Sequence, residues 1–240
     1  MHLRIDFAAS IPKDASSPTL NEDAWAHNDE HTCIALSDGA SESFDSRTWA
    51  KCLVEKYAAD QCFDREWVSS VVKAYDQSVD FESLGWAAQR AFDRGSFATL
   101  LGLTLVEDTS DLEVLCVGDS LVVHMRRGVI LDSFPFTKPE GFDARPTLVS
   151  TKREANTFLT EPGFFMSASK TWTVTPGDVV YIMTDAVGHW LLTEATTCAE
   201  TLETLQELSS EDELATLVHE LRAEQRMKLD DSTLIRLVVE

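Results

Sequence analysis

The spacing of hydrophobic residues changes several times along the chain, which predicts alternating groups of strands and helices. Residues 2–9 alternate weakly, as in an edge strand, and an apolar run from Thr32 ends abruptly at Ser37-Asp38-Gly39. Helical spacing follows and predicts helices over about residues 46–59, 65–79 and 82–94. We expect these helices to bury Trp49, Leu53, Tyr57, Trp67, Val71, Val72 and Tyr75.

Strand-like patterns return in the middle of the chain. Residues 95–105 and 112–117 are largely apolar, and a further strand at 121–125 follows directly after Gly118-Asp119-Ser120. We predict that the last two strands form a hairpin with Asp119 at its tip. The pattern then predicts a strand at Val179–Met183, helices at about 190–208 and 211–227, and a strand at about 229–239.

The pattern is lost over residues 134–172, which contain several prolines and scattered phenylalanines. Long irregular segments within a compact domain are usually functional lids or disordered insertions, and the aromatic residues favour a lid. No repeat or interdomain linker interrupts the chain, so we expect a single domain over residues 1–240.

The composition of the chain argues against several classes of function. The chain has 20 Lys+Arg against 41 Asp+Glu, a net charge of −21, which argues against binding to nucleic acids or anionic membranes. No apolar run is long enough to cross a membrane, and no secretory signal precedes the first strand. Cys33, Cys52, Cys62, Cys116 and Cys198 form no C-x-x-C pair, so we expect free thiols, several of them buried, in a cytoplasmic protein.

Acidic residues recur where apolar strands start or stop. Such ends can converge at one rim if two sheets pack face to face. Converged carboxylates repel unless a cation neutralises them or their pKa values rise. Hard oxygen ligands without a His/Cys cluster favour Mg²⁺ or Mn²⁺. Two such ions would activate a water for attack on phosphorus. The acids in question are Asp23, Asp38, Asp119, Asp185 and Asp230.

Several short motifs resemble those of PP2C-type (PPM) metal-dependent serine/threonine protein phosphatases, in a bacterial-type variant. They occur in that family's order and spacing over nearly the whole chain. The resemblance implies an αββα sandwich, an α+β fold with two central antiparallel sheets flanked by helices, and a flap at about 134–172 beside the active site. The motifs are Asn21-Glu-Asp-Ala, Ser37-Asp-Gly, Gly95-Ser-x-Ala-Thr, Val117-Gly-Asp-Ser, Thr184-Asp-Ala and Asp230-Asp-Ser-Thr.

The resemblance also assigns roles to residues. Asp38 would bridge two Mn²⁺ or Mg²⁺ ions, and Gly39 would contribute its carbonyl oxygen. Asp185 and Asp230 would hold the first ion. Glu22 would be a ligand of the second ion, and Asp23 would hold a water beside it. Asp119 would belong to a weaker third ion. A metal-bridging hydroxide would then attack phosphoserine or phosphothreonine, with Asp38 and Asp23 as the catalytic acids.

The chain departs from the family pattern at the substrate phosphate. Pro18 stands where the family usually has an arginine, and Lys13, Arg4, Lys152 and Arg153 remain open as replacements. His189 stands where an acid often follows, which weakens the case for a third ion. This histidine is either a proton donor, a phosphate contact or a structural residue.

Three functions remain open from the sequence. The first is a protein phosphatase acting on a phosphorylated protein, with a cognate serine/threonine kinase as partner and no nucleic acid or membrane partner. The second is a weak or inactive phosphatase-like regulator, and the third is a hydrolase of a small phosphorylated molecule. A monomer is expected in each case.

Overall fold

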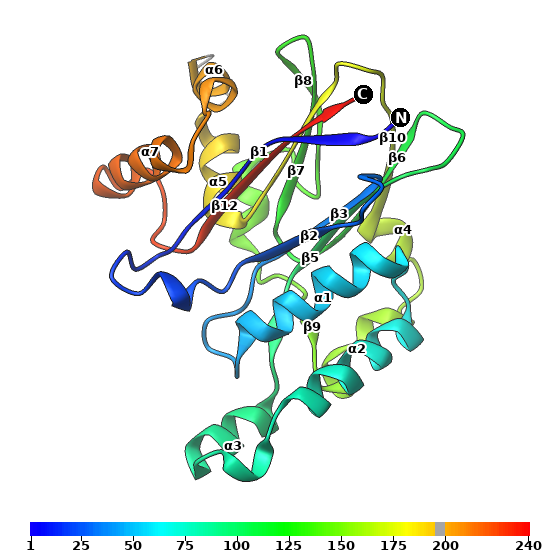
Figure 1. The fold of residues 1–240 in the computed structure, drawn as a ribbon, viewed down its shortest axis with the longest axis vertical. Coiled ribbons are helices and arrows are strands. Elements are labelled where there is room, and N and C mark those ends of the chain that lie inside the picture. Colours follow the sequence, from blue (N-terminus) through cyan, green and yellow to red (C-terminus); the bar gives the residue numbers. More distant parts are fainter. Residues whose placement is uncertain (195–199) are drawn as a thin grey trace.

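Two antiparallel five-stranded sheets lie face to face at the centre of the computed structural model, which describes residues 1–194 and 200–240 (Figure 1). The first sheet has the order β1-β12-β11-β7-β8, and the second has the order β10-β6-β5-β3-β2. The strands of the first sheet are β1 (Leu3–Ile11), β12 (Ser232–Val239), β11 (Val179–Met183), β7 (Leu121–Arg126) and β8 (Val129–Phe134). Those of the second are β10 (Ser169–Thr173), β6 (Asp111–Val117), β5 (Leu100–Leu105), β3 (Cys33–Ser37) and β2 (Ala24–His27).

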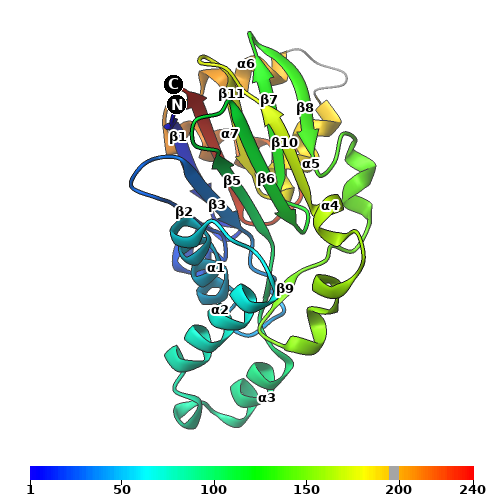
Figure 2. The same cartoon turned by 90° about the vertical axis from the view of Figure 1, so that its right-hand side faces the viewer.

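Helices cover both outer faces, so the predicted αββα sandwich is confirmed (Figures 1 and 2). The second sheet is covered by α1 (Ser46–Asp60) and α2 (Arg65–Ser78). The first sheet is covered by α5 (Asp185–Glu194), α6 (Glu200–Glu207) and α7 (Glu211–Ala223). The helix α3 (Trp86–Arg94) lies beyond α2 at the end of the molecule and buries none of its residues. No helix in the described ranges is long and apolar enough to cross a membrane.

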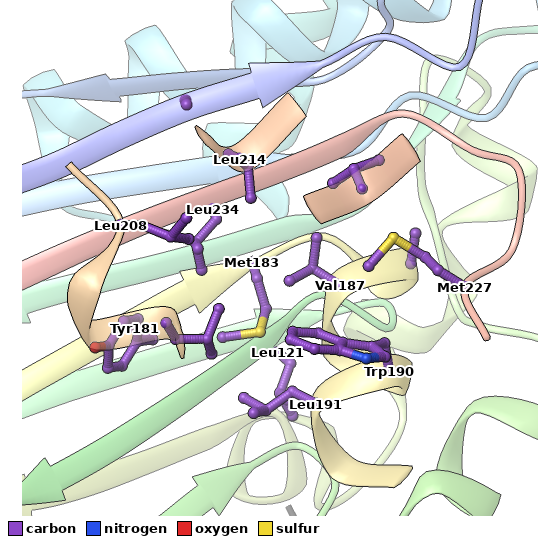
Figure 3. Packing of buried hydrophobic residues seen from close by; sticks show 14 of the residues in the cluster. Leu121, Tyr181, Met183, Val187, Trp190, Leu191, Leu208, Leu214, Met227 and Leu234 are labelled. Carbon is purple, nitrogen blue, oxygen red and sulfur yellow. The ribbon is translucent and has the colours of Figure 1, made fainter. Parts of the chain in front are cut away.

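Three apolar layers hold the sandwich together. The layer between the sheets includes Leu36, Leu101 and Ile235, and it explains why the central strands are apolar on both faces. The layer under α5 and α7 packs Met183, Trp190 and their neighbours against the first sheet (Figure 3). Under α1 and α2 lie Trp49, Leu53, Tyr57, Trp67, Val71 and Tyr75, as predicted, while Val72 is half-buried.

The predicted hairpin at Gly118-Asp119-Ser120 is wrong. Strand β6 pairs with β5 and β10 in the second sheet, whereas β7 pairs with β8 and β11 in the first. The turn therefore carries the chain from one sheet to the other. A local strand-turn-strand pattern cannot distinguish this crossing from a hairpin, because both strands are buried on both faces.

Helix boundaries differ from the predictions where local signals conflict. The helix α5 begins at Asp185, earlier than predicted, because the chain passes from β11 into the helix with only Thr184 between them. Its predicted continuation to residue 208 crosses residues 195–199, which lie outside the described residues, as does Cys198. The helix α7 starts as predicted, with Ser210 accepting a hydrogen bond from the Glu213 amide. Of the described cysteines, all are free; Cys33 and Cys116 are buried, Cys52 is half-buried and Cys62 is exposed.

The predicted flap segment is made of short elements rather than irregular chain. Its β9 (Val149–Ser150) pairs with β4 (Phe97–Ala98), and β10 joins the edge of the second sheet. One part, the 3-10 helix η3 (Pro139–Asp143), packs against α5. The remaining elements are η4 (Arg153–Ala155), η5 (Thr157–Thr160) and α4 (Phe164–Ala168); elsewhere η1 (Pro18–Leu20) and η2 (Phe81–Ser83) are 3-10 helices.

Candidate metal centre

Asp38 lies directly after β3, at a strand end held in place by Thr99. The Asp38 amide donates to Thr99 Oγ1 at 2.8 Å, and Ser37 Oγ donates to the Thr99 carbonyl at 2.5 Å. Gly39 pairs with Ala98 across a β-bridge. A Cβ at Gly39 would lie 2.9 Å from the Glu22 carbonyl oxygen and from two Ser46 atoms, so glycine is required here for close packing.

Glu22 is held as a carboxylate by three donors. Lys13 Nζ, Ser41 Oγ (2.6 Å) and Ser46 Oγ all donate to its side chain. Burial opposes ionisation, but these hydrogen bonds outweigh it and lower the pKa of Glu22 below its ordinary value. The side chain therefore carries a negative charge at neutral pH.

Asp23 is held at one oxygen and free at the other. Its Oδ2 accepts from Thr233 Oγ1 at 2.6 Å and from Thr184 Oγ1 at 3.2 Å, while the buried Oδ1 has no hydrogen-bond partner. Burial, followed by repulsion from Asp231 and Asp185, raises the pKa of Asp23 to about 8. A buried carboxylate oxygen without a partner is costly, and a water molecule held beside a cation would satisfy it.

The other acids of the cluster lie near enough to repel one another: Asp38, Asp119, Asp185 and Asp230. Burial raises the pKa of Asp38 well above its ordinary value, and repulsion from Asp23, Asp185, Asp230 and Asp119 adds to this. Burial, then repulsion from Asp185, raises the pKa of Asp119 to about 6. The fold thus brings the acids from separate strand ends near enough to raise one another's pKa, and either protonation or a nearby positive charge relieves their repulsion.

The donor set fits divalent cations of the Mg²⁺ or Mn²⁺ type. All its side-chain donors are carboxylate oxygens, and one of them, Asp185 Oδ1, is buried without a partner. The buried Oδ1 of Asp23, which would hold a water beside the ions, has no partner either. Within the described part of the chain, however, no three His, Cys, Asp or Glu side chains lie close enough to hold one ion together. Binding of one ion by three of these acids therefore requires their side chains to move closer together.

Only two of the candidate phosphate contacts lie beside the acids. Lys13 contacts Glu22 and Ser41, and His189 lines a cleft of about 690 Å³ together with Asp185. Lys152 lies over the Phe92 ring, 4.7 Å from its centroid, and Arg4 pairs with Asp6 and Glu240.

Arg153 lines a different cleft, of about 360 Å³, between α2 and residues 151–160. Nothing in that cleft belongs to the acidic cluster. Three of the candidate side chains therefore lie away from the acidic cluster: those of Lys152, Arg4 and Arg153.

Sequence reasoning missed three residues that organise the centre. Asp231 accepts the amides of Lys13 (2.7 Å) and Glu22 (2.8 Å), Thr233 holds Asp23, and Lys228 contacts Asp185 and Asp230. Asp231 and Thr233 belong to the Asp230-Asp-Ser-Thr motif and Lys228 lies two residues before it, so that motif was the available signal. The direction of each side chain depends on the folded loop, which the local sequence does not reveal.

No protein-family model and no curated protein matches the sequence. Solved structures do match: over nearly the whole of both chains, the fold is similar to that of phosphatases, among them serine/threonine phosphatases.

Among these structures, the catalytic domain of PstP in complex with two manganese ions has a TM-score of 0.61 and 17% identity, covering 98% of this chain and 97% of that one. PstP/Ppp of Mycobacterium tuberculosis has a TM-score of 0.60 and 16% identity over 100% of both chains. The photosystem II phosphatase PBCP has a TM-score of 0.58 and 18% identity over 99% of both chains. The fold expected from the PP2C-type motifs is therefore confirmed.

Proposed function

We propose that this protein is a PP2C-type, metal-dependent serine/threonine protein phosphatase. The observation that carries the proposal is the cluster of half-buried carboxylates from distant segments, in which Asp23 and Asp185 each have one buried oxygen without a partner. The fold shared with serine/threonine phosphatases supports it, including one determined with two manganese ions. Asp38 would be shared by two ions, with Asp185 and Asp230 as ligands of the first and Glu22 as a ligand of the second, and the Gly39 carbonyl would be a further ligand.

Two divalent cations bound there would lower the pKa of a water molecule and neutralise charge on the phosphoryl oxygens. The chain's own residues prepare this chemistry. Thr233 and Thr184 fix Asp23 through one oxygen and leave Oδ1 available to orient the attacking water. Ser41 and Ser46 hold Glu22 in its ionised form.

The substrate is proposed to be a phosphorylated protein, the product of a serine/threonine kinase. Pro18 leaves the usual arginine position without a charge, so phosphate binding falls to Lys13 and His189, the candidates beside Glu22 and Asp185. Lys13 also donates to Ser41 at 2.6 Å, so its ammonium is already directed by the site. A role for Asp119 at a third ion stays a prediction.

The direct test is phosphate release from a phosphothreonine peptide with Mn²⁺ present. We expect turnover by the wild-type protein and a loss of more than about 100-fold in Asp38→Asn, because even outer-shell substitutions at metal sites cost 10- to 100-fold. Circular dichroism of the variant checks that it folds. No release above the Asp38→Asn level would contradict the proposal.

A phosphatase-like regulator without turnover is the second candidate. Two observations favour it: Pro18 in place of the usual arginine, and lysines already paired with Glu22 and Asp185. Calorimetric titration with Mn²⁺ separates the two functions, since the regulator would bind no ion at millimolar concentration. An aryl phosphate hydrolysed in preference to the peptide would instead indicate a small-molecule substrate.

A further inference from the structure

Lys228 lies where the first metal ion is expected. Its ammonium donates to Asp185 Oδ2 and lies 3.4 Å from Asp230 Oδ2, and these two acids are the proposed ligands of that ion. The Asp185 side chain is only 13% exposed, so little water competes for it. In the metal-free chain, Lys228 therefore supplies the positive charge that this pair of acids requires.

The loop that carries Lys228 is fixed by contacts that do not involve the carboxylates of the metal centre. After α7, the amides of Arg226 (2.8 Å) and Met227 (3.2 Å) donate to the Leu221 carbonyl, and the Met227 side chain is buried. On the other side of Lys228, the Arg222 guanidinium donates to the Asp230 carbonyl and to Ser232 Oγ at 3.0 Å. The backbone thus holds the base of the lysine beside the acids.

The lysine nevertheless has room to leave. Its side chain is 45% exposed, and it lines the cleft of about 690 Å³ that also contains His189 and Phe142. Lysine has a long flexible stem, so its ammonium can move into this cleft without a change in the backbone. A divalent cation and an ammonium cannot both occupy the space between Asp185 and Asp230, because like charges at such distances repel strongly.

We propose that Lys228 is a tethered competitor of the first divalent cation: it occupies the Asp185/Asp230 pair in the metal-free protein and must be displaced when the ion binds. This rests on the proposed metal centre. It makes Lys228 a determinant of metal affinity, so that the site fills only at higher free Mn²⁺ than the acids alone would require.

The test is calorimetric titration of the purified protein with Mn²⁺. Lys228→Met keeps the apolar stem and removes the charge. Because one partly buried charge contact that competes with the ion is then gone, we expect one Mn²⁺ ion to bind more tightly, on the order of tenfold. Lys228→Arg keeps the charge and should bind as weakly as the wild type. Lys170→Met is the matched control, because Lys170 on β10 pairs with Asp132 on β8 at 2.5 Å, outside the acidic cluster, and this substitution should leave the affinity unchanged.

Two further measurements separate competition from general electrostatics. In Asp185→Asn, the Lys228→Met substitution should no longer raise the affinity as it does in the wild-type background, since one of the two competing contacts is gone. In EDTA, Lys228→Met should unfold at a lower temperature than the wild type, and Mn²⁺ should raise its melting temperature by more.

The outcomes of the titration test the competition by Lys228 separately from the proposed phosphatase function. Binding of Mn²⁺ with equal affinity to the wild type and Lys228→Met overturns the competition and leaves the phosphatase proposal intact. Absence of binding to every variant overturns the metal centre itself and the competition with it. Binding to Lys228→Met alone would support both.

Discussion

Gly39 has no Cβ, and this allows the close packing that sets the geometry of the centre. Its backbone packs between the Glu22 carbonyl and the start of α1, where a Cβ would lie 2.9 Å from atoms on both sides. We predict that Gly39→Ala lowers the free energy of unfolding by about 1–3 kcal/mol through overpacking, and weakens Mn²⁺ binding by displacing Asp38. Urea unfolding and calorimetry measure the two effects.

The matched control is Gly85→Ala, because a Cβ at Gly85 meets no atom within 4 Å. Gly85 is the N-cap of α3, so this control should cost less than about 1 kcal/mol. Equal losses for both variants would show that close packing at Gly39 does not matter.

At the scale of elements, a buried ion pair joins the turn before β11 to β7. Asp178 accepts from His124 Nε2 at 2.8 Å, from Arg126 Nε at 2.7 Å and from the Thr175 amide at 2.9 Å. Burial opposes ionisation, but the bonds from Arg126 and His124 outweigh it and hold the pKa of Asp178 well below its ordinary value. The folded state therefore binds a proton here less readily than the unfolded chain does.

In the unfolded chain, the pKa of Asp178 is about 4. Because folding lowers this pKa, the ionised side chain stabilises the fold above about pH 4, and the stabilisation is lost as the pH falls toward the pKa of the folded state. We predict that Asp178→Asn lowers the free energy of unfolding at pH 7 by about 2–4 kcal/mol, because the Arg126 guanidinium loses its counter-charge. Urea unfolding should show the gap between wild type and variant shrinking below about pH 4. A gap that stays constant with pH would exclude the charge as its cause, and the exposed Asp29→Asn serves as control.

At the scale of the whole molecule, Asp231 ties the two ends of the chain together. Its oxygens accept one hydrogen bond each from the amides of Lys13 and Glu22, so the C-terminal strand fixes the loop that carries the N-terminal acids. We predict that Asp231→Asn, which retains one accepting oxygen, costs about 1–3 kcal/mol, and that Asp231→Ala costs more. Urea unfolding ranks the variants, and an alanine variant as stable as the wild type would contradict this role.

Much of the fold followed from local pattern. The helices α1 and α2, the strands β3, β7, β11 and β12, and the burial of Trp49 and Tyr75 were predicted because each has a long, regular apolar period. The start of α5 and the internal structure of residues 134–172 were missed, since these elements are short and depend on pairing with distant segments.

The acids of the candidate centre were also found from sequence, because an acid at the end of an apolar strand is a local signal. The residue that would bind the substrate phosphate could not be chosen from the sequence. Pro18 stands at the usual arginine position and gives no indication of which other basic side chain would take over that role. Only the fold separates Lys13 and His189, which lie beside the acids, from Lys152 and Arg153.

The sequence by itself determined the period of each strand and helix and the placement of Asp23, Asp38, Asp119, Asp185 and Asp230 at strand boundaries, because these properties depend on near neighbours in the chain. The tertiary structure alone decided that β6 and β7 belong to opposite sheets, that Asp231 anchors the Lys13 loop and that Lys228 lies between Asp185 and Asp230. Those contacts join segments far apart in the chain or depend on how a loop folds back, and their energies arise only once the sheets have packed.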